Sequence, residues 1–168
     1  MRRKLVAGNW KMNGSLAALS ELDAIGAAAM AAPGVDVTVA VPFTLIHPAA
    51  VRAPGLAIGA EDVHEADSGA HTGCVSAAMV REAGAVFTIA GHSERRADQG
   101  ENSHDAWAKA AAAHRHGLSV ILCCGETGAA FAQASWLVSL WYSRRSEWPT
   151  IVKRAPASRT IAAETQPV

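Results

Sequence analysis

The stretch Val86-Phe87-Thr88-Ile89-Ala90 is an apolar run that leads directly into the polar residues Gly91-His92-Ser93-Glu94-Arg95-Arg96. A second block of this kind, Gly8-Asn9-Trp10-Lys11-Met12-Asn13-Gly14, follows the strand-like residues 4–7. Each block places ionisable or amide side chains where a buried strand ends. Parallel α/β folds collect their functional groups at that position. These two junctions therefore predict the type of fold and the location of a functional site.

Short apolar runs alternate with helical stretches along most of the chain. Most of the apolar runs are apolar at consecutive positions, as in strands that are buried on both faces of a parallel sheet. We expect strands over 4–7, 36–41, 56–59, 86–90 and 119–124, and helices over 15–31, 76–83 and 102–116. This order predicts right-handed βαβ units around a parallel sheet.

A doubly wound sheet and part of a βα barrel both fit this alternation. No Gly-x-Gly-x-x-Gly motif follows the first strand, and polar groups from several strand ends converge, which favours a barrel. The predicted fold class is therefore α/β, as a partial eight-stranded βα barrel of about five βα units. We expect residues 1–127 to form this domain and residues 128–168 to form a divergent C-terminal segment, part helical and part disordered.

Composition argues against several classes of partner. The chain has 168 residues, half of them hydrophobic, and a formal net charge of zero. Because no Lys/Arg run stands out, we expect neither a nucleic acid nor a membrane as partner, and the late apolar run 136–142 is too short to span a bilayer. An odd number of cysteines, two of them adjacent, predicts structural thiols in a cytoplasmic protein without a zinc site: Cys74, Cys123 and Cys124.

Lys11 and Asn9 belong to the turn that follows the first predicted strand. An ammonium there would meet an anionic substrate or stabilise developing negative charge, and the simpler alternative is a surface lysine. Asn9 would either donate a hydrogen bond from its amide or only cap the loop.

His92 opens a sequence that predicts a short helix with Ser93 as N-cap. The first amides of a helix carry partial positive charge, which disfavours a cationic imidazole. We therefore expect His92 to donate a hydrogen bond, uncharged, to a carbonyl or enediolate oxygen, with a structural histidine as the alternative. Glu94 is expected to pair with Lys11, unless the following arginines bind it in a surface cluster.

Four blocks, in order and in register, resemble the triosephosphate isomerase family: Gly8 to Gly14, Gly69-Ala70-His71-Thr72-Gly73, Gly91 to Arg96, and Cys123-Cys124-Gly125-Glu126-Thr127. The resemblance covers residues 4–127. It implies an eight-stranded βα barrel, usually dimeric, that interconverts dihydroxyacetone phosphate and glyceraldehyde 3-phosphate without a cofactor.

The resemblance also implies roles for four residues. Asn9 and Lys11 resemble the substrate-binding pair, with Lys11 neutralising charge on the substrate. His92 resembles the electrophile that polarises the carbonyl, and a neutral imidazole in that role is the known arrangement in this family. Glu94 resembles the partner of Lys11.

The sequence also departs from the family. It is roughly 80 residues shorter than a typical barrel of about 250, and it shows no counterpart of the general-base Glu in its Glu-Pro-Val-Trp setting, of the mobile lid or of the phosphate loop. Cys74 follows Thr72-Gly73 where the family has a Glu that pairs across the dimer with an arginine like Arg95. We therefore expect an inactive or severely impaired homologue with an altered homodimer contact at Thr72, Cys74 and Arg95.

Two other functions stay open at this stage. Five parallel strands that do not close a barrel leave unpaired edges, which would make the chain a non-enzymatic module that self-associates or is completed by a second chain. A third reading is an anion-binding remnant that uses Lys11 and His92.

Overall fold

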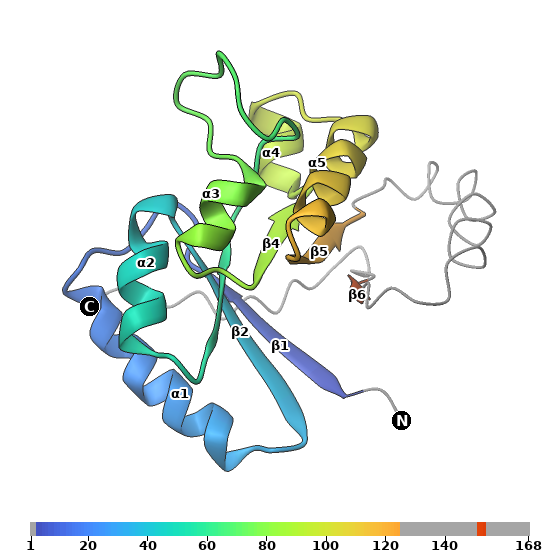
Figure 1. Cartoon of the computed structure of the whole chain (residues 1–168). Helices are drawn as coiled ribbons and strands as arrows, with labels where there is room; N and C mark the ends of the chain where they lie inside the picture. Colours follow the sequence, from blue (N-terminus) through green and yellow to red (C-terminus); the bar gives the residue numbers. More distant parts are fainter. Residues whose placement is uncertain (1–2, 125–150, 154–168) are drawn as a thin grey trace.

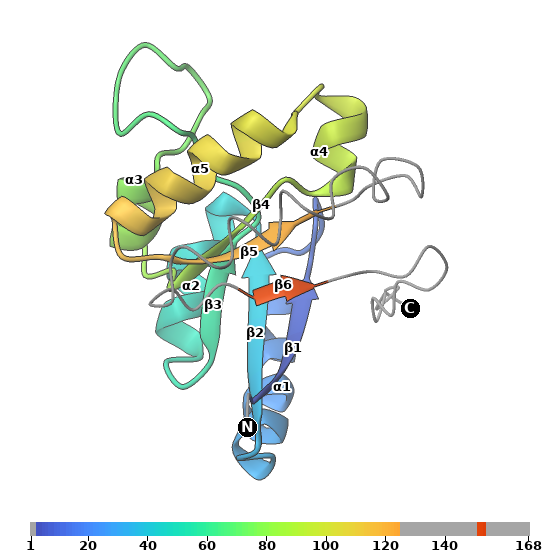
Figure 2. The same cartoon turned by 90° about the vertical axis from the view of Figure 1, so that its right-hand side faces the viewer.

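The structure is a computed structural model that describes residues 3–124 and 151–153. It contains one parallel sheet in the order β1-β2-β3-β4-β5-β6, which curls as in part of a barrel (Figures 1 and 2). The α/β fold class and all five expected strands are confirmed, with small shifts at the strand ends: β1 Lys4–Asn9, β2 Val35–Val41, β3 Ala57–Ala60, β4 Phe87–Ala90 and β5 Ser119–Cys123.

The sixth strand belongs to the segment that we expected to diverge. β6, Ile151–Lys153, pairs in parallel with β5 through Ile121↔Ile151. The other residues of the segment 128–168, and Gly125 to Thr127 of the fourth sequence block, lie outside the described residues.

The helices cover the outer face of the sheet (Figure 1). The expected helix over 15–31 begins with a short 3-10 turn, and a helix that we did not predict follows β2. The bounds are η1 Ala18–Ser20, α1 Glu21–Ala31, α2 Phe43–Arg52, α3 Ala77–Glu82, α4 Ser93–Asp98 and α5 Ser103–Arg115.

The unpredicted helix α2 contains Pro48 in its interior. Proline there removes a helical hydrogen bond and costs about 3 kcal/mol, so the sequence reads as a helix breaker at this point. Burial of Leu45, Ile46 and Ala49 against the sheet compensates for this cost. Tertiary packing therefore decides the conformation of this segment.

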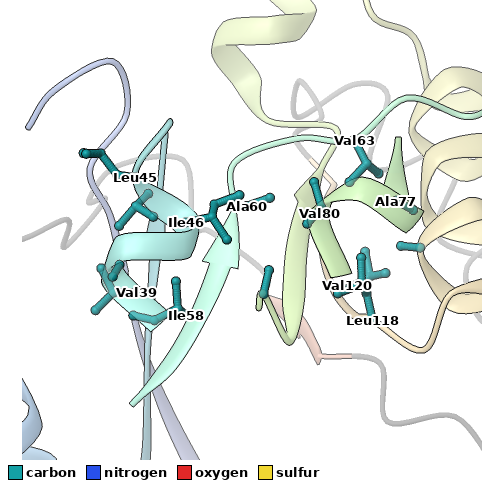
Figure 3. Packing of buried hydrophobic residues seen from close by; sticks show 14 of the residues in the cluster. Val39, Leu45, Ile46, Ile58, Ala60, Val63, Ala77, Val80, Leu118 and Val120 are labelled. Carbon is teal, nitrogen blue, oxygen red and sulfur yellow. The ribbon is translucent and has the colours of Figure 1, made fainter. Parts of the chain in front are cut away.

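The strand register divides the sheet residues between two faces. Val39, Ile58 and Val120 point outward into the main core, which also contains Leu45 and Ile46 of α2, Val80 of α3 and Leu118 (Figure 3). Val41 belongs to the same cluster. The inner face carries a smaller apolar cluster of Ala40, Phe87 and Ile89. β4 is buried on both faces, which explains why it reads as a continuous apolar run.

Register also fixes which inner residues lie at the same level. Asn9 pairs with Ala40, Ala40 with Gly59, and Gly59 with Phe87. Gly59 makes room for the ring of Phe87, because a Cβ on Gly59 would lie 2.4 Å from it. If this register is extended by two residues toward the carboxyl ends of the strands, the segments that follow β1 and β3 reach the edge of the sheet where β4 ends.

No helix within residues 3–124 is long and apolar enough to cross a membrane.

We predict opposite effects for two Gly→Ala substitutions, measured as the free energy of unfolding in urea. Gly59→Ala overpacks the inner face against Phe87 and should lower the free energy of unfolding by about 1–3 kcal/mol. Gly26→Ala, in α1 with open space around the new methyl group, should stabilise by about 0.5–1 kcal/mol. Equal effects of the two substitutions would contradict the tight Gly59–Phe87 contact.

Candidate active site

Three of the predicted site residues meet at one carboxylate. Lys11 Nζ lies 3.0 Å from Glu94 Oε1, and His92 Nδ1 lies 3.6 Å from Glu94 Oε2. The ion pair between Lys11 and Glu94 therefore forms as expected, rather than a cluster of Glu94 with Arg95 and Arg96. We call the sheet edge formed by Asn9, Lys11, Glu61, His92 and Glu94 the mouth.

The Lys11 backbone is held in a conformation that non-glycine residues avoid. Its φ of 55° lies in the left-handed region, and it is the one non-glycine residue with positive φ among the described residues. Such a conformation costs of order 1–2 kcal/mol and persists only where the surroundings enforce it. The Asn9 side chain supplies part of that constraint, because its Oδ1 accepts the Lys11 backbone N–H at 2.9 Å.

His92, and not Ser93, is the N-cap of α4. Its Nδ1 accepts the backbone N–H of Glu94 at 3.2 Å. An uncharged imidazole that accepts at Nδ1 carries its proton on Nε2, which leaves Nε2–H as a donor. Ser93 was the expected cap because serine is the commoner capping residue. The imidazole takes its place and thereby acquires a fixed tautomer.

The turn before His92 is tightly enclosed and requires glycine. Gly91 has a φ of 74°, and a Cβ there would lie 2.9 Å from both the Ala106 methyl group and the Cys123 carbonyl. Arg96 fastens this turn to β5: its Nε donates to Gly91 O at 2.8 Å, and its Nη2 donates to Cys123 O at 3.3 Å.

A buried ionic cluster lies beneath the same turn. Glu101 accepts the Gly91 backbone N–H at 2.9 Å, Arg95 Nε at 2.9 Å and Lys109 Nζ at 2.6 Å. Asp62 completes it with contacts to Arg95 and Lys109, both at 2.9 Å. Breaking such a cluster at one member leaves a buried charge without its partner, which costs several kcal/mol. The cluster thus fixes the start of α4 and with it His92.

The two acids of this cluster differ in their electrostatics. Burial opposes the ionisation of Glu101, but its bonds to Lys109 and Arg95 outweigh this and lower its pKa. Burial has the larger effect on Asp62 and raises its pKa despite the same two cations. Lys109 also lies closer to Glu101, at 2.6 Å, than to Asp62, at 2.9 Å, which agrees with the lower pKa of Glu101.

Glu61 is a mouth residue that our sequence reasoning did not single out. Its Oε1 is buried and has no hydrogen-bond partner among the described residues. Burial raises the pKa of Glu61 to about 8; a backbone hydrogen bond from Lys11 opposes this, and the nearby charge of Glu94 adds to it. Glu61 is therefore largely protonated at neutral pH. Its position directly after an apolar strand, as for His92, was the signal that could have identified it.

The residues expected at a dimer contact have different surroundings. Thr72 and Cys74 are exposed on the loop before α3. Arg95 is held within its own chain by Asp62 and Glu101. Within residues 3–124, no group of three His, Cys, Asp or Glu side chains is arranged to hold a metal ion.

We predict that the substitution Glu61→Gln makes stability less dependent on pH. An unfolded glutamate with a pKa of 4.5 loses its proton well before the folded one, so the wild-type free energy of unfolding falls as pH rises from about 5 to about 8. At pH 8 we expect the free energy of unfolding of the variant to exceed that of wild type by on the order of 1–2 kcal/mol. The difference is limited to this size because Glu61 is partly exposed to solvent.

The measurement is urea unfolding at several pH values, with Glu82→Gln on the exposed surface of α3 as the charge-matched control. A Glu61→Gln variant that is less stable than wild type at pH 8, or a control that gains as much, would contradict the buried protonated carboxyl.

Comparison with known proteins agrees with this geometry. The family model described as triosephosphate isomerase matches residues 4–145. The match extends past Thr127, where the four short sequence blocks end. The triosephosphate isomerase of Dinoroseobacter shibae is 56% identical over 131 residues, which cover 77% of this chain and 53% of that protein. The triosephosphate isomerase of Jannaschia sp. is 55% identical over 131 residues, which cover 77% of this chain and 52% of that protein.

A solved structure shows the same fold. The triosephosphate isomerase of Bartonella henselae superposes with a TM-score of 0.72 at 38% identity, over 80% of this chain and 56% of that chain. The chain spans about half the length of the curated relatives that it matches. The family model, the identities and the shared fold together establish that this chain belongs to the triosephosphate isomerase family.

Proposed function

We propose that the chain binds a triose phosphate at the mouth and takes part in the interconversion of dihydroxyacetone phosphate and glyceraldehyde 3-phosphate. The observation that carries this proposal is that Lys11 and His92 approach the same carboxylate of Glu94. The ammonium and the imidazole ring therefore lie at the same edge of the sheet, where both can act on a single small anion. Family membership supplies the substrate class.

The two groups have complementary tasks in this reaction. His92 Nε2–H donates a hydrogen bond to the substrate carbonyl oxygen, which stabilises the negative charge that develops when a carbon-bound proton is removed. Lys11 neutralises the charge of the substrate. Its ion pair with Glu94 is partly exposed, with 36% of the Lys11 side chain accessible, so an incoming anion can compete for the ammonium.

The described residues supply the electrophilic half of this chemistry. Among the carboxyl groups that the structure describes near the mouth, Glu94 is paired with Lys11 and Glu61 is protonated near neutral pH. A positioned general base contributes about 10²–10⁴-fold to the rate. We therefore propose that the chain turns over triose phosphate far more slowly than a complete isomerase, although it binds it.

Several family properties stay predictions for this chain. A homodimer is inferred from the family alone, and a cytoplasmic location from the cysteine content. Thr72 and Cys74 are exposed and could contact a second subunit. Arg95, by contrast, already forms ion pairs with Asp62 and Glu101 of its own chain.

An alternative function follows from the edge of the sheet. β1 pairs only with β2 among the described strands, and Val6 on it is 56% exposed. Such an edge can pair with another chain. Concentration-dependent association in size-exclusion chromatography, without triose phosphate binding, would favour this alternative. A compact monomer with a cooperative melt would count against it.

We predict weak catalysis by the purified chain. With glyceraldehyde 3-phosphate as substrate, kcat should fall below about 1 s⁻¹, the lower end of ordinary enzyme rates. Coupled detection of dihydroxyacetone phosphate measures this rate. Turnover at tens per second or faster would refute the impaired activity but not the binding site.

We predict that the binding of an anionic ligand at the mouth depends on Lys11. In calorimetric titrations with 2-phosphoglycolate, Lys11→Met should weaken binding about tenfold or more, because it removes a charge-assisted contact. Lys4→Met, at the opposite end of β1, removes the same charge away from the mouth and serves as control. Equal affinities of the two variants would rule out Lys11 as the anion-binding group.

A further inference from the structure

The two peptide groups that flank His92 both accept hydrogen bonds from a single residue, Arg96. Arg96 Nε donates to Gly91 O at 2.8 Å, and the Arg96 backbone N–H donates to His92 O at 3.1 Å. The first bond holds the peptide plane that precedes His92, and the second holds the plane that follows it. Because φ and ψ describe the rotation of these two rigid planes, Arg96 restrains both dihedral angles of His92, −56° and 141°.

The Gly91 carbonyl needs a side-chain donor because the chain leaves the sheet at this point. The pairing of β4 with β5 ends at Ala90↔Leu122, and Gly91 is buried with a φ of 74°. A buried carbonyl that has left the strand ladder must be paired elsewhere. The Arg96 guanidinium meets this need, and a Cβ on Gly91 would lie 2.8 Å from Arg96 Nη2. Glycine therefore leaves the space that the guanidinium requires.

The guanidinium is itself held by two other elements. Arg96 Nη1 donates to Ser103 Oγ at the start of α5, at 3.2 Å, and Nη2 donates to Cys123 O at the end of β5, at 3.3 Å. A guanidinium presents its donors in a rigid planar fork, so three contacts fix its orientation, whereas a lysine ammonium cannot reproduce these directions. Arg96 thus ties the His92 backbone to α5 and β5.

The His92 backbone decides which ring nitrogen carries the proton. In the observed conformation Nδ1 accepts the Glu94 backbone N–H at 3.2 Å, which leaves the proton on Nε2. The Glu94 carboxylate offers the opposite arrangement, because its Oε2 lies 3.6 Å from Nδ1, too far for a hydrogen bond. If the ring moved closer, Nδ1–H would donate to this oxygen. Nε2 would then lack the proton that it offers to a substrate oxygen.

We propose that Arg96 is a positioning residue for His92, whose bonds to the two flanking peptides keep Nδ1 on the Glu94 N–H and Nε2–H free for the substrate. The inference rests on the proposed function, in which His92 donates to the substrate carbonyl oxygen. Arg96 acts through the backbone of His92 and needs no contact with the substrate.

The ¹⁵N NMR spectrum of the His92 ring tests this in the full chain without ligand, at pH 8.5. In wild type we expect a protonated Nε2 and an unprotonated Nδ1. In Arg96→Met the two ring shifts should move toward each other, because the Nδ1–H tautomer becomes populated. Arg96→Lys, which keeps the charge but lacks the fork, should lie between.

Arg81→Met is the matched control. Arg81 Nη1 also donates to a backbone carbonyl, Ala85 O at 3.2 Å, but at the opposite end of β4. Its ring spectrum should equal that of wild type. Wild-type ring shifts in Arg96→Met, or an equal change in Arg81→Met, would overturn the inference. If Arg96→Met does not fold, wild-type ring shifts in Arg96→Lys would overturn it.

A second readout separates this inference from the proposed function. The dissociation constant for 2-phosphoglycolate should rise about threefold to tenfold in Arg96→Met, the effect of about one hydrogen bond, and should stay unchanged in Arg81→Met. Arg96→Lys separates lost geometry from lost charge and should show a smaller rise. If the wild-type chain does not bind 2-phosphoglycolate, the proposed function fails, and the ligand-free ring spectra alone decide whether Arg96 positions His92.

Discussion

The parallel register of the strands is the constraint on which the site depends. Because Asn9, Ala40, Gly59 and Phe87 lie at one level, the residues after β1, β3 and β4 reach the same edge. Lys11 and His92 are far apart in the sequence, yet both approach Glu94 there. A shift of register by one residue would turn each inner side chain to the outer face and dismantle the mouth.

Two further sets of contacts fix the geometry of these residues. The cluster of Asp62, Arg95, Glu101 and Lys109 anchors the Gly91 turn from below, so His92 begins α4 in a fixed position. Above it, the Asn9 amide oxygen accepts the Lys11 backbone N–H and so helps to hold Lys11 in its left-handed conformation. The cluster contains the buried charges of Glu101 and Lys109, which are costly unless they are satisfied. Their presence beneath the Gly91 turn is consistent with a site in which geometry matters more than stability.

The sequence predicted those parts that depend on local pattern. Five strands were recognisable from apolar runs, and the polar blocks around Lys11 and His92 marked the mouth. Features that depend on tertiary contacts were missed. α2 forms despite Pro48 because its apolar face is buried, and His92 replaces Ser93 as the cap. The raised pKa of Glu61 depends on how deeply its carboxyl is buried, which no local pattern reveals.

The most direct test of the shared mouth is the protonation state of the His92 ring, observed by ¹⁵N NMR with and without 2-phosphoglycolate. The structure predicts an uncharged ring with its proton on Nε2, and an Nε2 shift that responds to the ligand in wild type but much less in Lys11→Met. A ring protonated on Nδ1, or a response unaffected by the loss of the Lys11 ammonium, would show that the two groups do not serve one substrate.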